Sequence, residues 1–205
     1  MRFHSLSATL VLTTRLLYSY TGEPVEIGKG RIIRKPGGIR ALSEEITANG
    51  SSDSKLGGGS RGQRREDRVA ILSIGTRLSE ALIAADEVEE MEPDLAVTVA
   101  DARFMKPLDT ELVRELAKDN GILITIEEGS IGGFGDHVLH FLSLDGALDE
   151  GGLKFRPMVL PDAYFEAATQ YEQYEMAGLN SHHILGTVLR LAKKVDVPVL
   201  SEVSD

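Results

Sequence analysis

Two adjacent carboxylates followed by a glycine-rich loop are the residues of this sequence best suited to chemistry. Glu127 and Glu128 follow the apolar run Ile122–Ile126, and glycines stand at 129, 132, 133 and 135, just ahead of His137. Glycines at this density suit a loop that needs positive φ or a close approach of the backbone. An apolar strand, a loop and a helix start in succession indicate the carboxyl edge of a buried parallel strand, where open α/β sheets bind ligands or partner surfaces.

A nucleotide phosphate is one candidate ligand of such a loop, because a helix N-terminus can bind an anion. The glycines at 129–135 do not match G-x-G-x-x-G, however, and no Gly-Lys-Ser/Thr follows, as a P-loop requires. The two glutamates would also repel a phosphate. Nucleotide binding by Gly129–Gly135 is therefore kept only as a weaker alternative.

The two carboxylates are not expected to act as a catalytic acid and base, since side chains alternate along a strand and only one of them faces the loop side. Such a mechanism needs both groups to converge on one substrate bond. We expect one glutamate to cap the following helix, or to pair with Arg103 or Lys106 at the end of the neighbouring strand, or with another chain. The candidate interface residues are therefore Arg103, Lys106, Glu127, Glu128 and His137.

The five histidines give a weaker signal. Asp136–His137 with His140 has the one-turn spacing of a metal site, but a third ligand is not evident, and a surface or interface role is expected. His182 and His183 stand at a predicted helix start and, as neighbours, are not expected to face one metal. The sequence has no cysteine and no nucleophile elbow. We therefore assign no catalytic, cofactor-binding or metal-binding residue in this chain.

Apolar runs that alternate with helical periodicity must position these residues. Strands are expected at Val69–Ile74, Leu95–Ala100, Ile122–Ile126 and Lys154–Leu160, with Pro157 placing the last at an edge of the sheet. Helices are expected after an N-cap at Thr76, after Asp109, near Asp136, over Ala167–Ala177 up to Gly178, and from a cap at Ser181 to Lys194. The alternation predicts an α/β fold of three layers, with a mostly parallel sheet covered on both faces.

Length and composition limit both the domain count and the partners. The chain of 205 residues suits one ordinary domain, and its net charge of −10 argues against nucleic acid or an anionic membrane as the main partner. No apolar run long enough for a membrane span, about 18 residues, occurs. We divide the chain into a lead-in (1–34), a disordered Gly/Ser/Arg-rich insertion (35–67), the α/β domain (68–195) and a tail (196–205). The first 22 residues lack acids, as in an organellar presequence; a strand left from an upstream domain is the alternative.

Four segments of the sequence closely resemble the C-terminal domain of the 1-deoxy-D-xylulose-5-phosphate synthase family. They are Val99–Asp109, Thr125–Val138, Leu153–Asp162 and Ala177–Asn180, within a resemblance that runs from Val69 to Lys194. Gly22–Arg34 is similar to the linker that enters this domain. The resemblance implies a transketolase C-terminal domain-like fold with a five-stranded, mostly parallel sheet. It also implies a homodimeric enzyme that uses thiamine diphosphate and Mg²⁺ to join a two-carbon unit from pyruvate to glyceraldehyde 3-phosphate, for isoprenoid, thiamine and pyridoxal precursors.

In that family the cofactor site lies in the N-terminal domain, and the glutamate that activates the thiazolium lies in the middle domain; neither domain is expected in this chain. Leu16–Gly22 stands where the family has an arginine-containing segment, and the 35–67 insertion is longer than the family's turn. We therefore expect a fragment, a mispredicted gene start or a shortened paralogue, inactive without the missing domains. A stand-alone module that binds a full-length synthase is the alternative. The resemblance implies a plastid location for a plant or algal source and the cytoplasm otherwise.

Overall fold

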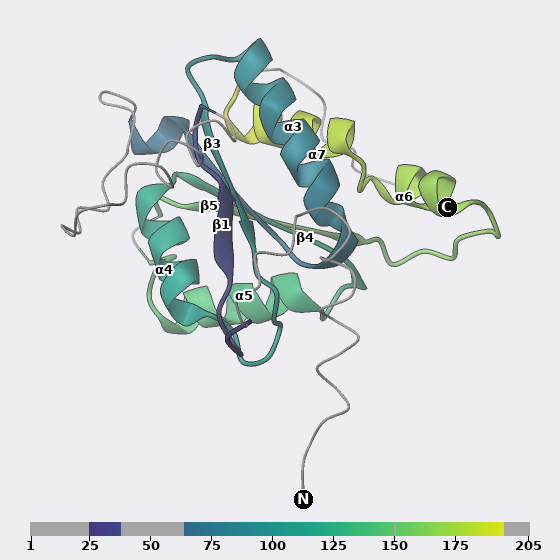
Figure 1. Ribbon diagram of the computed structural model, residues 1–205, viewed down its shortest axis with the longest axis horizontal. Coiled ribbons are helices and arrows are strands. Elements are labelled where there is room, and N and C mark those ends of the chain that lie inside the picture. The colour runs from purple at the N-terminus through teal and green to yellow at the C-terminus, as the bar shows by residue number, and fades with distance from the viewer. Residues whose placement is uncertain (1–24, 38–63, 150, 195–205) are drawn as a thin grey trace, which may run out of the picture.

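The computed structural model describes residues 25–37, 64–149 and 151–194, which fold around one five-stranded sheet (Figure 1). The expectations for residues 1–24, for most of the insertion and for the tail from 195 lie outside the described residues. The strands are β1 (Arg31–Arg34), β2 (Arg68–Ser73), β3 (Ala96–Asp101), β4 (Ile122–Ser130) and β5 (Lys154–Leu160). Their spatial order is β1-β3-β2-β4-β5, with β1 antiparallel to β3 and all other pairs parallel.

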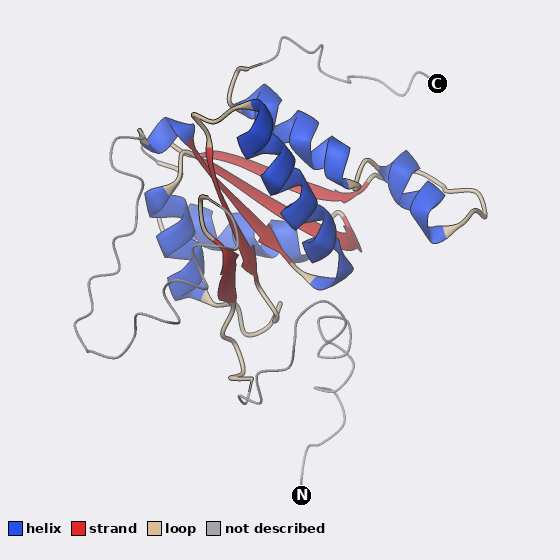
Figure 2. Ribbon diagram, turned by 45° about the horizontal axis from the view of Figure 1, so that its top comes forward, coloured by secondary structure: helices blue, strands red, loops and turns tan. Residues whose placement is uncertain are grey.

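Helices cover both faces of the sheet and complete three layers (Figure 2). On one face α3 (Leu78–Met91) and α7 (Ser181–Leu191) pack over residues such as Ile71 and Ile124, and on the other α4 (Thr110–Asp119) and α5 (Phe134–Leu144) pack over Leu72 and Leu123. These four strand side chains are at most 1% exposed, and fully burying each contributes roughly 1.5–3 kcal/mol. The predicted α/β fold with a mostly parallel, doubly covered sheet is confirmed.

α6 (Gln170–Ala177) differs from the other helices because none of its residues is buried. It lies on an arm that extends from the body of the molecule after β5 (Figures 1 and 2). Thr169 caps its first turn through a capping box with Glu172, and Gly178 ends it with a φ of 72°. This helix is therefore held by its caps, by polar contacts and by the partly buried Tyr174 and Ala177, which pack against the core. Among the described residues, none of the helices has the length and apolar character needed to cross a bilayer.

β1 joins the sheet through a segment that the sequence assigns to the lead-in. Arg31 and Ile32 pair with Asp101 and Ala100 of β3. The side chain of Arg34 is 2% exposed, and its guanidinium lies 3.0 Å from Asp86 Oδ1 and 2.7 Å from Glu89 Oε2 of α3. Arg34 Nη1 also donates to the carbonyl oxygen of Val97 at 2.7 Å. A buried guanidinium is tolerated here because carboxylates and a carbonyl replace the lost water.

Local signals predict most of the element ends correctly. β5 is an edge strand, as Pro157 requires, and Asp109 Oδ1 accepts from Leu112 N at 3.0 Å as the N-cap of α4. Two predicted caps are wrong. Thr76 lies in the short 3₁₀ helix η2 (Gly75–Arg77), after which α3 begins with Arg77 at its N-cap, and Asn180 rather than Ser181 is the N-cap of α7. β4 also continues to Ser130, beyond the predicted end at Ile126.

Candidate functional site

The extension of β4 places Glu127 and Glu128 on opposite faces of the sheet, as the period of a strand requires. Glu127 is 6% exposed and faces α5, where its Oε1 accepts a hydrogen bond from the backbone N–H of Gly135 at 2.7 Å. This confirms the prediction that one glutamate caps the following helix. Asp136 also accepts from the backbone N–H of Gly132. The helix N-terminus that a phosphate would need is therefore occupied by the protein's own carboxylates.

The glycine loop leaves room for the Glu127 carboxylate. A Cβ atom on Gly129 would lie 2.6 Å from Glu127 Oε2, and one on Gly133 would lie 2.8 Å from Glu127 Cδ. Gly132 has a φ of 92°, which favours glycine for conformational reasons. The loop thus wraps around a buried carboxylate and does not offer the amide cradle of a nucleotide-binding loop.

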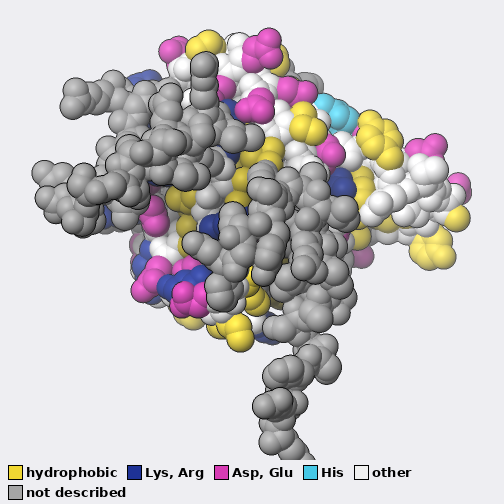
Figure 3. Space-filling view, viewed as in Figure 1, with side chains coloured by type: hydrophobic (Ala, Val, Ile, Leu, Met, Phe, Trp, Pro, Cys, Tyr) yellow, Lys and Arg dark blue, Asp and Glu magenta, His cyan; other side chains and the backbone are white. Residues whose placement is uncertain are grey.

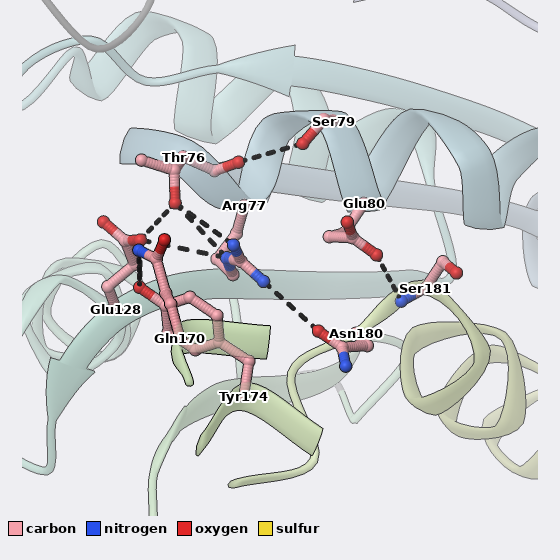
Figure 4. A network of polar contacts seen from close by, with 9 residues as sticks. All are labelled: Thr76, Arg77, Ser79, Glu80, Glu128, Gln170, Tyr174, Asn180 and Ser181. Carbon is pink, nitrogen blue, oxygen red and sulfur yellow. Dashed lines mark hydrogen bonds and ion pairs between the residues drawn. The ribbon is translucent and has the colours of Figure 1, made fainter. Parts of the chain in front are cut away.

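Glu128 belongs to a second polar network, which joins β4, η2, α6 and the start of α7 (Figure 4). Its Oε1 accepts from the hydroxyls of Thr76 and Tyr174, the latter at 2.5 Å. Arg77 Nε lies 3.9 Å from the same oxygen, and the Arg77 guanidinium stacks 3.7 Å from the centre of the Tyr174 ring. Arg77 Nη1 also donates to Asn180 Oδ1 at 3.4 Å. We call Thr76, Arg77, Glu128, Tyr174 and Asn180 the Glu128 network.

Arg77 is only 8% exposed, and the other residues of the Glu128 network compensate the burial of its positive charge. Burial raises the pKa of the Tyr174 hydroxyl, and its hydrogen bond to Glu128 adds to the increase, so that the phenol remains a donor at neutral pH. The hydroxyls of Thr76 and Tyr174 and the guanidinium of Arg77 thus gather around one oxygen of Glu128. The network joins α6 to the carboxyl edge of the sheet.

Arg103 and Lys106 do not form an ion pair with Glu127 or Glu128, which the sequence analysis gives as the alternative to a helix cap. β2 lies between β3 and β4, so residues at the ends of β3 and β4 are separated by two strand spacings, about 10 Å. Arg103 instead donates its backbone N–H to Asp101 Oδ1 at 3.0 Å, and its Nε lies 3.9 Å from Asp101 Oδ2. Of the alternatives given for the two glutamates, Glu127 thus takes the capping one, and pairing with Arg103 or Lys106 does not occur within the described part of the chain.

The remaining members of the candidate interface differ in exposure. Lys106 is exposed, and His137 is half-buried in the first turn of α5. Asp101 is 1% exposed, and this burial raises the pKa of its carboxyl group despite the nearby Arg103 and Arg31. Burial likewise lowers the pKa of Arg103. Whether these residues meet another chain remains a prediction.

His182 and His183 do converge, contrary to expectation. Their Nε2 atoms lie 3.0 Å and 3.9 Å from Glu175 Oε1, and the two ring centroids are 3.9 Å apart. Within residues 25–37, 64–149 and 151–194, this is the one group of histidine and acidic side chains whose ligand atoms gather within 4.8 Å of one another. The missed signal is Gly178, whose left-handed turn brings the end of α6 back to the start of α7.

Comparison with known proteins assigns the chain to a family. The chain matches the transketolase C-terminal domain family over residues 58–184. It is 44% identical over 173 residues to the probable chloroplastic 1-deoxy-D-xylulose-5-phosphate synthase 2 of Oryza sativa subsp. japonica, covering 84% of this chain and 20% of that protein. It is 44% identical over 170 residues to the chloroplastic synthase 1 of Cannabis sativa, covering 83% of this chain and 19% of that protein.

A solved structure supports the same fold. The chain superposes on a split-gene transketolase, solved as an inactive β4 tetramer, with a TM-score of 0.60, 22% identity, and coverage of 85% of this chain and 46% of that chain. The chain therefore spans about a fifth of the length of its curated relatives and about half of this structural neighbour. The resemblance inferred from its motifs is confirmed, and the chain belongs to the transketolase C-terminal domain family.

Proposed function

We propose that this chain acts as the C-terminal domain of a 1-deoxy-D-xylulose-5-phosphate synthase and is inactive by itself. In this proposal the whole enzyme condenses pyruvate with glyceraldehyde 3-phosphate, releases CO₂ and supplies isoprenoid, thiamine and pyridoxal precursors. The observation that carries the proposal is the 44% identity to plant synthases across 84% of the chain. In a plant or alga the location would be the plastid, in keeping with the chloroplastic designation of these relatives; in a bacterium it would be the cytoplasm.

The glycine loop and Glu128 lack the free groups that would bind the diphosphate of thiamine diphosphate. A diphosphate needs free backbone N–H groups or basic side chains, whereas the N–H groups of Gly132 and Gly135 donate to Asp136 and Glu127. One oxygen of the Glu128 carboxylate, Oε1, already accepts from Thr76 and Tyr174 and lies 3.9 Å from Arg77 Nε. As the family resemblance implies, we assign the cofactor and the catalytic groups to the N-terminal and middle domains of the synthase.

The role left to this domain is structural. Its sheet presents a rigid carboxyl edge, and the exposed Lys106, the half-buried His137 and the α6 arm extend the surface there. We propose that this surface supports the middle domain and the dimer. A second candidate, a separate module that binds a full-length synthase, is favoured by one observation: α6 buries none of its residues, while Tyr171 and Met176 are 66% and 53% exposed.

A chimera tests the first function. In the rice synthase 2, the segment that matches this chain is replaced by residues 25–194, which include β1, and formation of 1-deoxy-D-xylulose 5-phosphate is measured with thiamine diphosphate and Mg²⁺. The control carries the rice segment through the same cloning junctions. We expect activity from the chimera and none from the isolated chain. A folded chimera without activity, or turnover by the isolated chain, would reject the proposal.

The second function has its own experiment. The chain is immobilised and incubated with the purified rice synthase, and a variant with Tyr171 and Met176 changed to serine serves as the matched control. Retention by the wild-type chain and loss in the variant would support a separate binding module. No retention at micromolar concentrations would reject it.

A further inference from the structure

The turn between α6 and α7 gathers two imidazoles and a carboxylate at the surface, outside the Glu128 network. His182 Nε2 and His183 Nε2 lie 3.0 Å and 3.9 Å from the same oxygen, Glu175 Oε1. Figure 3 shows histidine surface, in cyan, near the place where the α6 arm leaves the body. Glu175 is 42% exposed and His182 is 52% exposed, so an ion from solution can reach the three side chains.

The three ligand atoms are oriented by contacts behind them. Asn180 Nδ2 donates to Glu175 Oε2 at 2.7 Å, which leaves Oε1 directed at the histidines. Asn180 is 2% exposed, and its own oxygen accepts from Arg77, so its position is fixed by the body of the fold. His183 Nδ1 is buried without a hydrogen-bond partner, so Nε2 is the nitrogen available to a ligand. Hydrogen bonds of this kind orient ligands in metal sites.

The spacing of these atoms suits a transition-metal ion. Zinc binds histidine nitrogen and carboxylate oxygen at about 2.0–2.2 Å, and tetrahedral geometry then puts neighbouring ligand atoms about 3.4 Å apart. The separations of 3.0 Å and 3.9 Å from Glu175 Oε1 bracket this value. All three ligand atoms lie within 4.8 Å of one another. Two imidazoles with one carboxylate favour Zn²⁺, Co²⁺, Ni²⁺ or Cu²⁺ over Mg²⁺ and Ca²⁺, which prefer oxygen ligands.

The local charge also favours a cation. The N-terminus of α7 carries roughly half a positive charge, which by itself would oppose a metal at His182 and His183. Two carboxylates offset it: Glu175, and Glu80 of α3, whose Oε2 accepts from the backbone N–H of Ser181 at 2.9 Å. The site therefore has a net negative charge before an ion enters.

We propose that Glu175, His182 and His183 form a binding site for one divalent transition-metal ion, with water completing the coordination. Such an ion would link the last turn of α6 to the first turn of α7. α6 buries no residue, so each link that joins it to the body affects its orientation. Metal binding thus offers a further means of fixing the arm beside the Glu128 network, with which the site shares Asn180.

The experiment measures Zn²⁺ binding to the full 205-residue chain without an affinity tag, by titration calorimetry, and Co²⁺ binding by visible absorption. We expect each chain to bind one metal ion. His182→Ala and Glu175→Gln should each weaken binding at least about tenfold, since each removes or weakens one of three ligands. The matched control changes His4, His137 and His140 to alanine together and should bind as the wild type does.

Three results of the titrations would contradict the proposed metal site. No binding by the wild type, binding unaffected by His182→Ala, or loss in the control variant would each contradict it. Folding of every variant is checked by circular dichroism. A second measurement needs no substitution: nitrogen-15 spectra of the imidazoles should show Zn²⁺ shifting the Nε2 signals of two histidines and leaving the other three unchanged. Shifts spread over all five would identify adventitious surface binding and reject the proposal.

Discussion

The hydroxyl of Tyr174 donates to Glu128 across 46 positions of sequence, and this contact joins the exposed helix α6 to the carboxyl edge of the sheet. The Tyr174 ring also covers the guanidinium of Arg77 at 3.7 Å. One side chain thus contacts both charges of a partly buried ion pair. The orientation of the arm therefore depends on Tyr174, whose ring, together with Ala177, also packs against the core.

Tyr174→Phe separates these two contacts, because it removes the hydroxyl and keeps the ring over Arg77. A hydrogen bond to a charged group contributes roughly 1.5–3 kcal/mol, and partial exposure of this one should lower the loss to about 1 kcal/mol. Urea unfolding followed by circular dichroism measures the change. Tyr171→Phe, at a side chain that is 66% exposed, is the control and should change the free energy of unfolding by less than about 0.5 kcal/mol. Equal effects of the two substitutions would contradict the role of the hydroxyl.

Gly133→Ala tests whether the glycine loop exists to accommodate Glu127. The added Cβ would lie 2.8 Å from Glu127 Cδ and 2.9 Å from Oε1, and relieving such overlap in a packed region typically costs about 1–3 kcal/mol. Gly186→Ala, in α7 with open space around its Cβ, should instead stabilise by about 0.5–1 kcal/mol. In a Glu127→Ala background the cost of Gly133→Ala should largely disappear. An unchanged cost in that background would assign the glycine another role.

Sequence patterns predict the helices and strands of this fold better than they predict which strands lie next to each other in the sheet. The apolar run of β2, the cap at Asp109, the edge position indicated by Pro157 and the helix stop at Gly178 are local signals, and the structure confirms each. The order of strands is not local. β2 inserts between β3 and β4, so the loop carrying Arg103 lies two strands away from Glu128 instead of beside it.

The site residues that the sequence missed depend on contacts between distant segments. Thr76 has the right type for a helix cap, but its hydroxyl donates to Glu128, 52 positions away, and the helix starts later. His182 and His183 would diverge in the middle of a helix, yet the turn at Gly178 brings Glu175 against both. The family resemblance rests on motifs and is confirmed, whereas the geometry of these side chains requires the fold.

Arg34→Met should show how firmly β1 belongs to the sheet. The guanidinium is 2% exposed and compensates Glu89, which is 18% exposed. Removing one partner of a buried ion pair typically costs about 3–5 kcal/mol, because the other charge stays buried. Arg34→Lys should cost less, since it keeps the charge and loses the two-pronged geometry. Arg64→Ala, whose partners Glu66 and Asp67 lie on the surface, is the control and should cost less than about 1 kcal/mol in the same urea unfolding assay. A small effect of Arg34→Met would mean that β1 contributes little to folding.

Asp101→Asn should change how stability depends on pH. Burial raises the pKa of the Asp101 carboxyl above its ordinary value of 3.8, so the folded chain holds this proton more tightly than the unfolded chain does. The protonated Asp101 carboxyl group therefore contributes fully to the free energy of unfolding below pH 3.8. This contribution is lost as the pH rises through the higher pKa of the folded state. Asparagine does not titrate, and its oxygen can still accept from the backbone N–H of Arg103.

The free energy of unfolding of the Asp101→Asn variant, relative to the wild type, should therefore increase between acidic and neutral pH. Chemical unfolding at a series of pH values from 3.5 to 7.5, for the wild type and the variant together, measures this difference. Asp162→Asn, at an exposed loop position, serves as the matched control and should give a nearly flat difference. A difference that falls with rising pH would mean that attraction from Arg103 and Arg31 outweighs the burial of the carboxylate, and it would reverse the assigned direction of the pKa shift.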